Sequence, residues 1–205
     1  MYFARFVSVI VFALTAVVGQ QRTAPKKPAT LPEALEAAKR AADAEQFGGA
    51  IAALQEAIKL LQRQQRAAIL ASMPKVDGYE VQDDEVDESA EALGVSAFVM
   101  TAVTRRYNKD DKHITVEVTA NSPMLGMLAA MFANPTIIKA DGGELVQYGA
   151  HKAILKEGKD RDTELQILMH DKHLIKVTAQ GLTGDQVLKL FDQAFVDRME
   201  KPLGK

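Results

Sequence analysis

The segment that decides the fold runs Arg106-Tyr107-Asn108-Lys109-Asp110-Asp111-Lys112-His113-Ile114-Thr115-Val116-Glu117-Val118-Thr119. In its second half, every other residue from Ile114 to Val118 is apolar and β-branched, and the residues between them are polar or charged. Such alternation predicts a strand with one buried face. The preceding segment 96–107 is rich in Val, Thr and Phe, and Asn108-Lys109-Asp110-Asp111 supplies turn residues. Together these segments predict an antiparallel β-hairpin.

The chain around this hairpin predicts more short strands and two helices. A first strand is expected at 79–82, and four others are expected after the hairpin, at 145–148, 152–156, 163–170 and 173–178. One helix is expected from Met124 to Ala133, after Ser122 as N-cap, and a last helix is expected to open at Thr183 and Asp185. Tight turns between strands, with helices kept apart from them, indicate the α+β class. We expect residues 73–205 to form an antiparallel sheet of about six or seven strands flanked by helices.

The segment before this domain predicts an α-helical hairpin over residues 31–72. Thr30 and Glu33 form a capping box for an alanine-rich helix over 31–45. Paired glycines at 48–49 interrupt the helical pattern, because glycine costs roughly 1 kcal/mol inside a helix. A second helix is expected over 50–72, where apolar residues recur every three or four positions. These apolar residues are Ile51, Leu54, Ile58 and Leu61.

The first 19 residues predict a signal peptide. Arg5 supplies positive charge, and the apolar run from Phe6 to Val18 is shorter than the roughly 20 residues that cross a membrane. Cleavage is expected near Gly19, with an uncleaved anchor as the alternative, and residues 20–30 are expected to form a linker. No cysteine follows, so acylation as a lipoprotein is excluded. The sequence therefore predicts a periplasmic or secreted protein with no integral membrane span after cleavage.

Composition excludes several classes of function. The chain has 205 residues with a formal net charge of −2, which gives no electrostatic reason to expect nucleic acid as a partner. It contains no cysteine, so disulfides, thiolate zinc sites, iron–sulfur clusters and thiol nucleophiles are all excluded.

The second helix of the hairpin resembles a tetratricopeptide repeat. The likeness lies in the segment Phe47-Gly48-Gly49-Ala50-Ile51-Ala52-Ala53-Leu54-Gln55-Glu56-Ala57-Ile58, with small, large and small residues at Ala50, Leu54 and Ala57. It covers a single unit, about residues 34–61. Such repeats bury their faces by stacking, so the resemblance implies that this unit packs on the following domain or on another chain.

Residues 73–203 resemble a group of uncharacterised bacterial exported proteins, and their predicted topology is similar to sheet domains of the Mog1/PsbP type. The matching features are Pro74 with Gly78-Tyr79, the Arg106-Tyr107 hairpin, Asn121-Ser122-Pro123-Met124-Leu125, Asn134-Pro135, and Leu174-Ile175-Lys176-Val177-Thr178-Ala179-Gln180-Gly181. Neither resemblance implies an activity, because the first group has no assigned role and the second fold carries several.

The helix from Met124 to Ala133 is the strongest candidate for a binding surface. Its large apolar side chains are Met124, Met127, Leu128, Met131 and Phe132. Methionine is flexible and polarisable, so a methionine-rich face can accept varied apolar partners such as a lipid, a peptide or another envelope protein. The alternative is that the helix is buried, with one face on the sheet and the other on a neighbouring helix.

Other candidate sites are weaker. The acidic run from Asp83 to Glu91 suits calcium or, alternatively, a solvated loop beside a strand edge. His170 and His173 are expected to flank a two-residue turn and to face one another, which suits a metal, but two ligands are too few. The segment Gly94-Val95-Ser96-Ala97-Phe98 lacks the closing glycine of a nucleophile elbow. No catalytic residue, cofactor or metal ligand is therefore predicted.

Three hypotheses of function follow from these patterns. The first is a non-catalytic envelope protein that binds an unknown protein partner through the helical hairpin, the methionine-rich helix or both. The second is a carrier of an apolar ligand or lipid on the methionine-rich helix. The third is a metal-dependent hydrolase built on His170 and His173. The sequence does not decide the oligomeric state.

Overall fold

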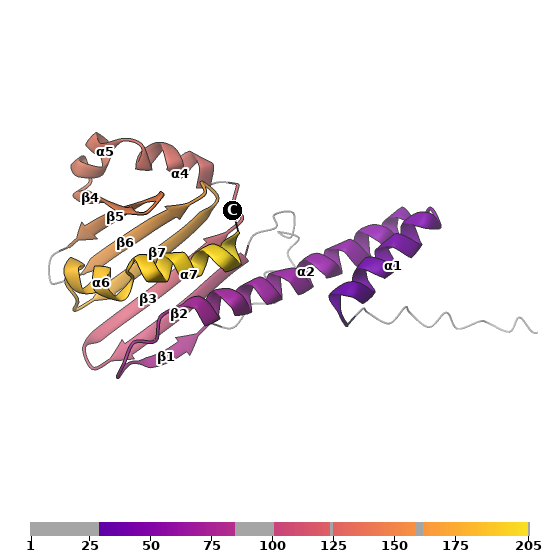
Figure 1. Ribbon diagram of the computed structural model, residues 1–205, viewed down its shortest axis with the longest axis horizontal. Coiled ribbons are helices and arrows are strands. Elements are labelled where there is room, and N and C mark those ends of the chain that lie inside the picture. The colour runs from indigo at the N-terminus through magenta and orange to yellow at the C-terminus, as the bar shows by residue number, and fades with distance from the viewer. Residues whose placement is uncertain (1–28, 85–100, 124, 159–161, 205) are drawn as a thin grey trace, which may run out of the picture.

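The computed structural model describes residues 29–84, 101–123, 125–158 and 162–204 (Figure 1). The predicted signal peptide, most of the linker, most of the acidic run and the segment around Ser96 lie outside these residues. The elements are α1 (Leu31–Asp43), α2 (Phe47–Ser72), β1 (Glu80–Asp83), β2 (Thr101–Lys109), β3 (Lys112–Ala120), α4 (Leu125–Phe132), α5 (Pro135–Ala140), β4 (Gly143–Tyr148), β5 (His151–Glu157), β6 (Thr163–Met169), β7 (His173–Gln180), α6 (Gly184–Leu190) and α7 (Gln193–Leu203).

The seven strands form one antiparallel sheet in the order β1-β2-β3-β7-β6-β5-β4. Strands that neighbour one another in the sheet are consecutive in sequence in every pair except β3–β7, which lies at the centre. The deciding hairpin is present, with Arg106 opposite Thr115 and Lys109 opposite Lys112. Its alternation also holds, because Ile114, Val116 and Val118 are buried. The α+β class and the helices flanking an antiparallel sheet are thus confirmed.

Helices cover the two faces of the sheet to different extents (Figure 1). The C-terminal part of α2 packs with α6 and α7 on one face, and the main hydrophobic core lies between them and the strands. This core includes Ile69, Met73, Tyr107, Phe191 and Phe195, and the two phenylalanine rings meet edge to face. On the other face, α4 and α5 cover a smaller cluster over the β5–β7 region.

Several boundaries differ from the expectations. The second helix begins at Phe47, three residues earlier than expected, so Gly48 and Gly49 lie in its first turn and not before it. The segment after Asn134 forms the short helix α5, since the Asn134 side chain accepts from the backbone N–H groups of Thr136 and Ile137. The expected single last helix is two helices, because Asp192 caps a new one by accepting from the N–H of Phe195.

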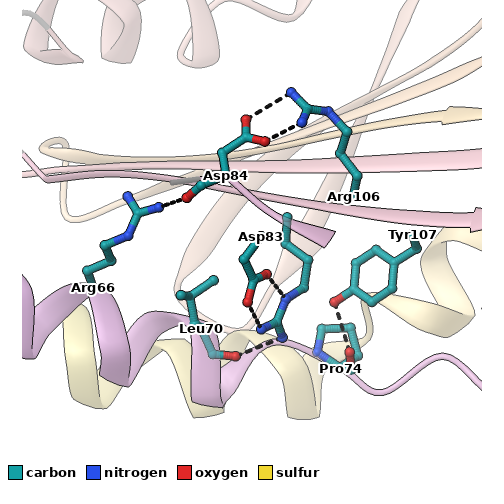
Figure 2. A network of polar contacts seen from close by, with 8 residues as sticks. Arg66, Leu70, Pro74, Asp83, Asp84, Arg106 and Tyr107 are labelled. Carbon is teal, nitrogen blue, oxygen red and sulfur yellow. Dashed lines mark hydrogen bonds and ion pairs between the residues drawn. The ribbon is translucent and has the colours of Figure 1, made fainter. Parts of the chain in front are cut away.

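A polar network fastens α2 to the first strands (Figure 2). Arg105 forms a bidentate pair with Asp83, with Nε 2.6 Å from Oδ1, and its Nη1 donates to the Leu70 carbonyl. The Tyr107 hydroxyl donates to the Pro74 carbonyl at 2.8 Å.

The same network continues at the end of β1. Arg66 of α2 donates to the carbonyls of Ala102 and Asp84, and Arg106 pairs with the Asp84 carboxylate. These bonds satisfy carbonyls at the helix end and beside the strand edge, so the direction in which α2 leaves the sheet is fixed.

Candidate functional site

The helical hairpin exposes a row of large apolar side chains. Phe47, Ile51, Leu54 and Leu61 of α2 are between 47% and 67% exposed, and Ile58 between them is half-buried. Their spacing alternates between four and three residues, the spacing of a coiled-coil seam. We call these five residues the α2 seam. They lie on the part of α2 that extends away from the sheet (Figure 1).

Small residues explain why the large ones face outward. Where α1 packs on α2, the buried residues are Ala34 and Ala38 of α1 and Ala50 and Ala57 of α2. A β-carbon added at Gly49 would lie 3.6 Å from the β-carbon of Ala41, so the helices approach closely there. The contact between the two helices therefore leaves no room for the seam residues, whose side chains stay outside it.

The α2 seam leads into a groove beside the sheet. This groove, of about 460 Å³, is lined by Ile58, Leu61, Gln62, Gln64, Gln65, Ala68, Asn121 and Pro202. Gln65 joins its walls: its Nε2 donates to the Pro202 carbonyl at 3.0 Å, and its Oε1 accepts from Thr101 at 2.8 Å. The polar atoms of Gln65 are thus satisfied. Most of the surface that the groove exposes is apolar.

The methionine-rich helix lies against the sheet. In α4, Phe132 is 3% exposed, and it forms one buried cluster with Leu125, Ile138, Ile154 and Leu168. Leu128 packs against this cluster as well. Met124 and the side chains of Met127 and Met131 lie outside the described structure.

A hollow of about 50 Å³ lies beside Leu128 and Phe132. Ligand pockets for small molecules usually measure about 300–1,000 Å³, so this hollow gives the carrier hypothesis no support.

Three side chains lie close together at one end of the sheet, although their proximity could not be predicted from the sequence. His151 Nε2 lies 2.5 Å from Glu200 Oε1, and His170 Nε2 lies 3.1 Å from Glu200 Oε2. The two imidazole rings are perpendicular, with centroids 5.0 Å apart. We call His151, His170 and Glu200 the histidine cluster. Hydrogen bonds from His151 and then from His170 hold the pKa of Glu200 below its ordinary value, against the opposing effect of partial burial.

His173 stands next to this cluster but is oriented away from it by a backbone contact. Its Nδ1 accepts from the N–H of Asn121 at 3.1 Å, and its ring meets that of His170 edge to face at 6.3 Å. Burial, with the nearby charges of Lys172 and His170, lowers the pKa of His173 to about 4, so the ring is neutral near pH 7. Among the described residues, its Nε2 has no hydrogen-bond partner.

The expected arrangement of His170 and His173 across a two-residue turn is wrong. Met169 and His173 form the last pair of the β6–β7 hairpin, so His170 lies within a three-residue turn. Both His170 and Asp171 have positive φ, at 52° and 55°. The turn therefore points His170 toward α7, where Glu200 lies. Glu200 itself had no sequence signal, since an isolated glutamate near a helix end is common.

The two remaining candidate sites, the acidic run and the Ser96 segment, lie mostly outside the residues that the structure describes. Of the acidic run, Asp83 and Asp84 are described, and both pair with arginines of β2. The Ser96 segment is not described. Within the described ranges, no helix is long and apolar enough to cross a membrane.

Comparison with protein-family models, with curated proteins and with solved structures found no match. The resemblances to a tetratricopeptide repeat, to exported bacterial proteins and to the Mog1/PsbP type therefore stay predictions.

Proposed function

We propose that the protein is a non-catalytic interaction module of the cell envelope, and that the α2 seam is its binding surface for the same helix of a second copy. The observation that carries this proposal is the row of large apolar residues on the projecting part of α2, four of which are about half or more exposed. The envelope location rests on the predicted signal peptide.

The spacing of the seam favours a helix as the occupant. From Phe47 to Leu61 the row extends about 21 Å at 1.5 Å per residue. Ile51 and Ile58 occupy one set of alternate seam positions, and leucine or phenylalanine occupies the other. Isoleucine at the first set with leucine at the second is the combination that favours pairing of two helices.

The flanks of the seam favour a second copy. On one side lie Gln55 and Gln62, which carry no charge, so two identical helices would bring no like charges together. On the other side lie Ala50 and Ala57, which α1 covers within the same chain. A two-fold axis would therefore place apolar surface against apolar surface on both copies.

The test is the mass of the purified chain in solution over a dilution series, by sedimentation equilibrium. We expect a dimer that dissociates on dilution, and Leu54→Lys should weaken it at least about tenfold, because it places a charge at the centre of the seam. Ala52→Lys is the matched control, since residue 52 is exposed and lies roughly opposite residue 54 around the helix.

A second measurement tests the geometry directly. The chain has no cysteine, so a single introduced one is unambiguous. Leu54→Cys should form an interchain disulfide under mild oxidation, and Ala52→Cys should form far less. A chain that is monomeric at every concentration, or equal behaviour of the paired variants at positions 52 and 54, would overturn the proposal.

A further inference from the structure

We propose that the histidine cluster binds a divalent transition-metal ion, for which Zn²⁺ is the best match. Two imidazole nitrogens and a carboxylate oxygen are ligands that Zn²⁺ accepts, and the set contains no thiolate. The three ligand atoms of His151, His170 and Glu200 all lie within 4.8 Å of one another. This site is separate from the α2 seam, so it goes beyond the interaction proposed above.

The distances between the ligand atoms suit a small tetrahedral ion. At bond lengths near 2.1 Å, two ligands of a tetrahedral zinc ion lie about 3.4 Å apart. The separations from Glu200 to the two histidines, 2.5 Å and 3.1 Å, are somewhat shorter, because a carboxylate now accepts directly from both rings. Both rings present Nε2 to the carboxylate, so an ion between them would take the place of the two bridging protons once the side chains move to metal–ligand distances.

The core holds the three ligands in place. His151 pairs with Tyr148 where β4 meets β5, His170 follows Met169, and Glu200 follows Met199. Tyr148, Met169 and Met199 are all at most 5% exposed and belong to the main core. The ligands therefore come from β5, the β6–β7 turn and α7, each next to a residue of the packed core, which lowers the entropy cost of forming the site.

Access and coordination number also fit. His151 is buried, whereas the side chains of His170 and Glu200 are 24% and 31% exposed. An ion can therefore enter from solvent, and the fourth position stays open to water. Three protein ligands plus water is the arrangement of open zinc sites. His173 contributes no ligand, because its Nδ1 already accepts from Asn121 and its other nitrogen is buried.

The experiment is calorimetric titration of the metal-free full chain with ZnCl₂, together with thermal unfolding with and without the ion. We expect one ion per chain and a higher unfolding temperature with Zn²⁺, since the ion would link two hairpins to α7 and bind only the folded state. Glu200→Gln and His170→Ala should each weaken binding about 100-fold or more. Both positions are partly exposed, and unfolding in EDTA checks that the variants still fold.

His113→Ala is the matched control. His113 is an exposed histidine whose Nδ1 lies 3.0 Å from the Asn108 side chain, on the far hairpin between β2 and β3. This variant should bind Zn²⁺ as the unchanged chain does. The proposal would be overturned if the unchanged chain showed no saturable binding, or if Glu200→Gln and His170→Ala bound Zn²⁺ as tightly as the unchanged chain does. A loss of binding in His113→Ala as large as in those variants would also overturn it, and the cluster would then be a hydrogen-bonded ion pair only.

Discussion

The two halves of α2 carry similar apolar residues and place them in opposite environments. Ile51 is 57% exposed and Ile69, on the same helix, is fully buried. The sheet, α7 and the arginine network surround the C-terminal half, whereas α1 is the one described element that lies along the N-terminal half (Figure 1). The amphipathic pattern of a helix therefore predicts which residues would be buried against another surface. Whether that surface belongs to the same chain depends on the rest of the fold.

The largest expected difference in the free energy of unfolding is between the same substitution, isoleucine to alanine, in the two halves of α2. Ile69→Ala should lower the free energy of unfolding by about 2–4 kcal/mol, because it leaves a cavity in the main core. Ile51→Ala should change it by less than about 0.5 kcal/mol in dilute solution, where no second copy covers the residue. Urea denaturation followed by circular dichroism measures both. Similar losses at the two positions would mean that the N-terminal half of α2 is covered within the chain.

A smaller loss of unfolding free energy is expected when a hydrogen bond between β2 and the segment after α2 is removed. Tyr107→Phe removes the donor to the Pro74 carbonyl and should cost about 1–2 kcal/mol of unfolding free energy. Tyr148→Phe is the matched control, because among the described residues the Tyr148 hydroxyl has no hydrogen-bond partner. Burial raises the pKa of Tyr148 to about 12, so its hydroxyl is protonated near neutral pH and Tyr148→Phe removes no charge. The control should be neutral or slightly stabilising, and a larger loss there than at Tyr107 would contradict this account.

The smallest expected effect concerns the charge pair at the same joint. The hydrogen bond from Arg105 lowers the pKa of Asp83, so the pair stabilises the folded state above the unfolded-state pKa of about 3.9 and is lost as pH falls through the lower folded-state value. Asp83→Asn should therefore cost only about 0.5–1 kcal/mol at pH 7, because the Asp83 side chain is 37% exposed and solvent screens the pair. The difference from the unchanged chain should shrink as the solution is acidified below pH 4. Asp77→Asn, at an exposed position before β1, serves as the control and should show no such trend.

The parts of the fold that could be predicted from the sequence are those that depend on residues close together along the chain. β3 was predictable because its alternation is uninterrupted, and Thr30 does cap α1 by accepting from the N–H of Glu33. The break between α6 and α7 was missed, because Phe191 and Phe195 continue the helical spacing across it. Asp192, with its capping side chain, was the available signal.

The histidine cluster could not be predicted from the sequence. His151 and His170 come together only because β5 and β6 are neighbours in the sheet and their turns lie at the same end as the last turn of α7. Strand order and the direction of α7 follow from packing between distant segments. The α2 seam was visible as an amphipathic stripe, but its exposure depends on how far the sheet extends beneath the helix.

The pairing of β3 with β7 has a consequence for how the molecule assembles. Thr119 lies opposite Leu174, although α4, α5 and three strands separate them along the chain. Every other strand pair is formed either by a hairpin or, between β1 and β2, by segments close in sequence. Joining the centre of the sheet therefore closes the longest loop and carries the largest loss of chain entropy. We therefore expect β1–β3 and β4–β7 to form first, each through contacts between strands close in sequence, and the pairing of β3 with β7 to be the slow step of folding.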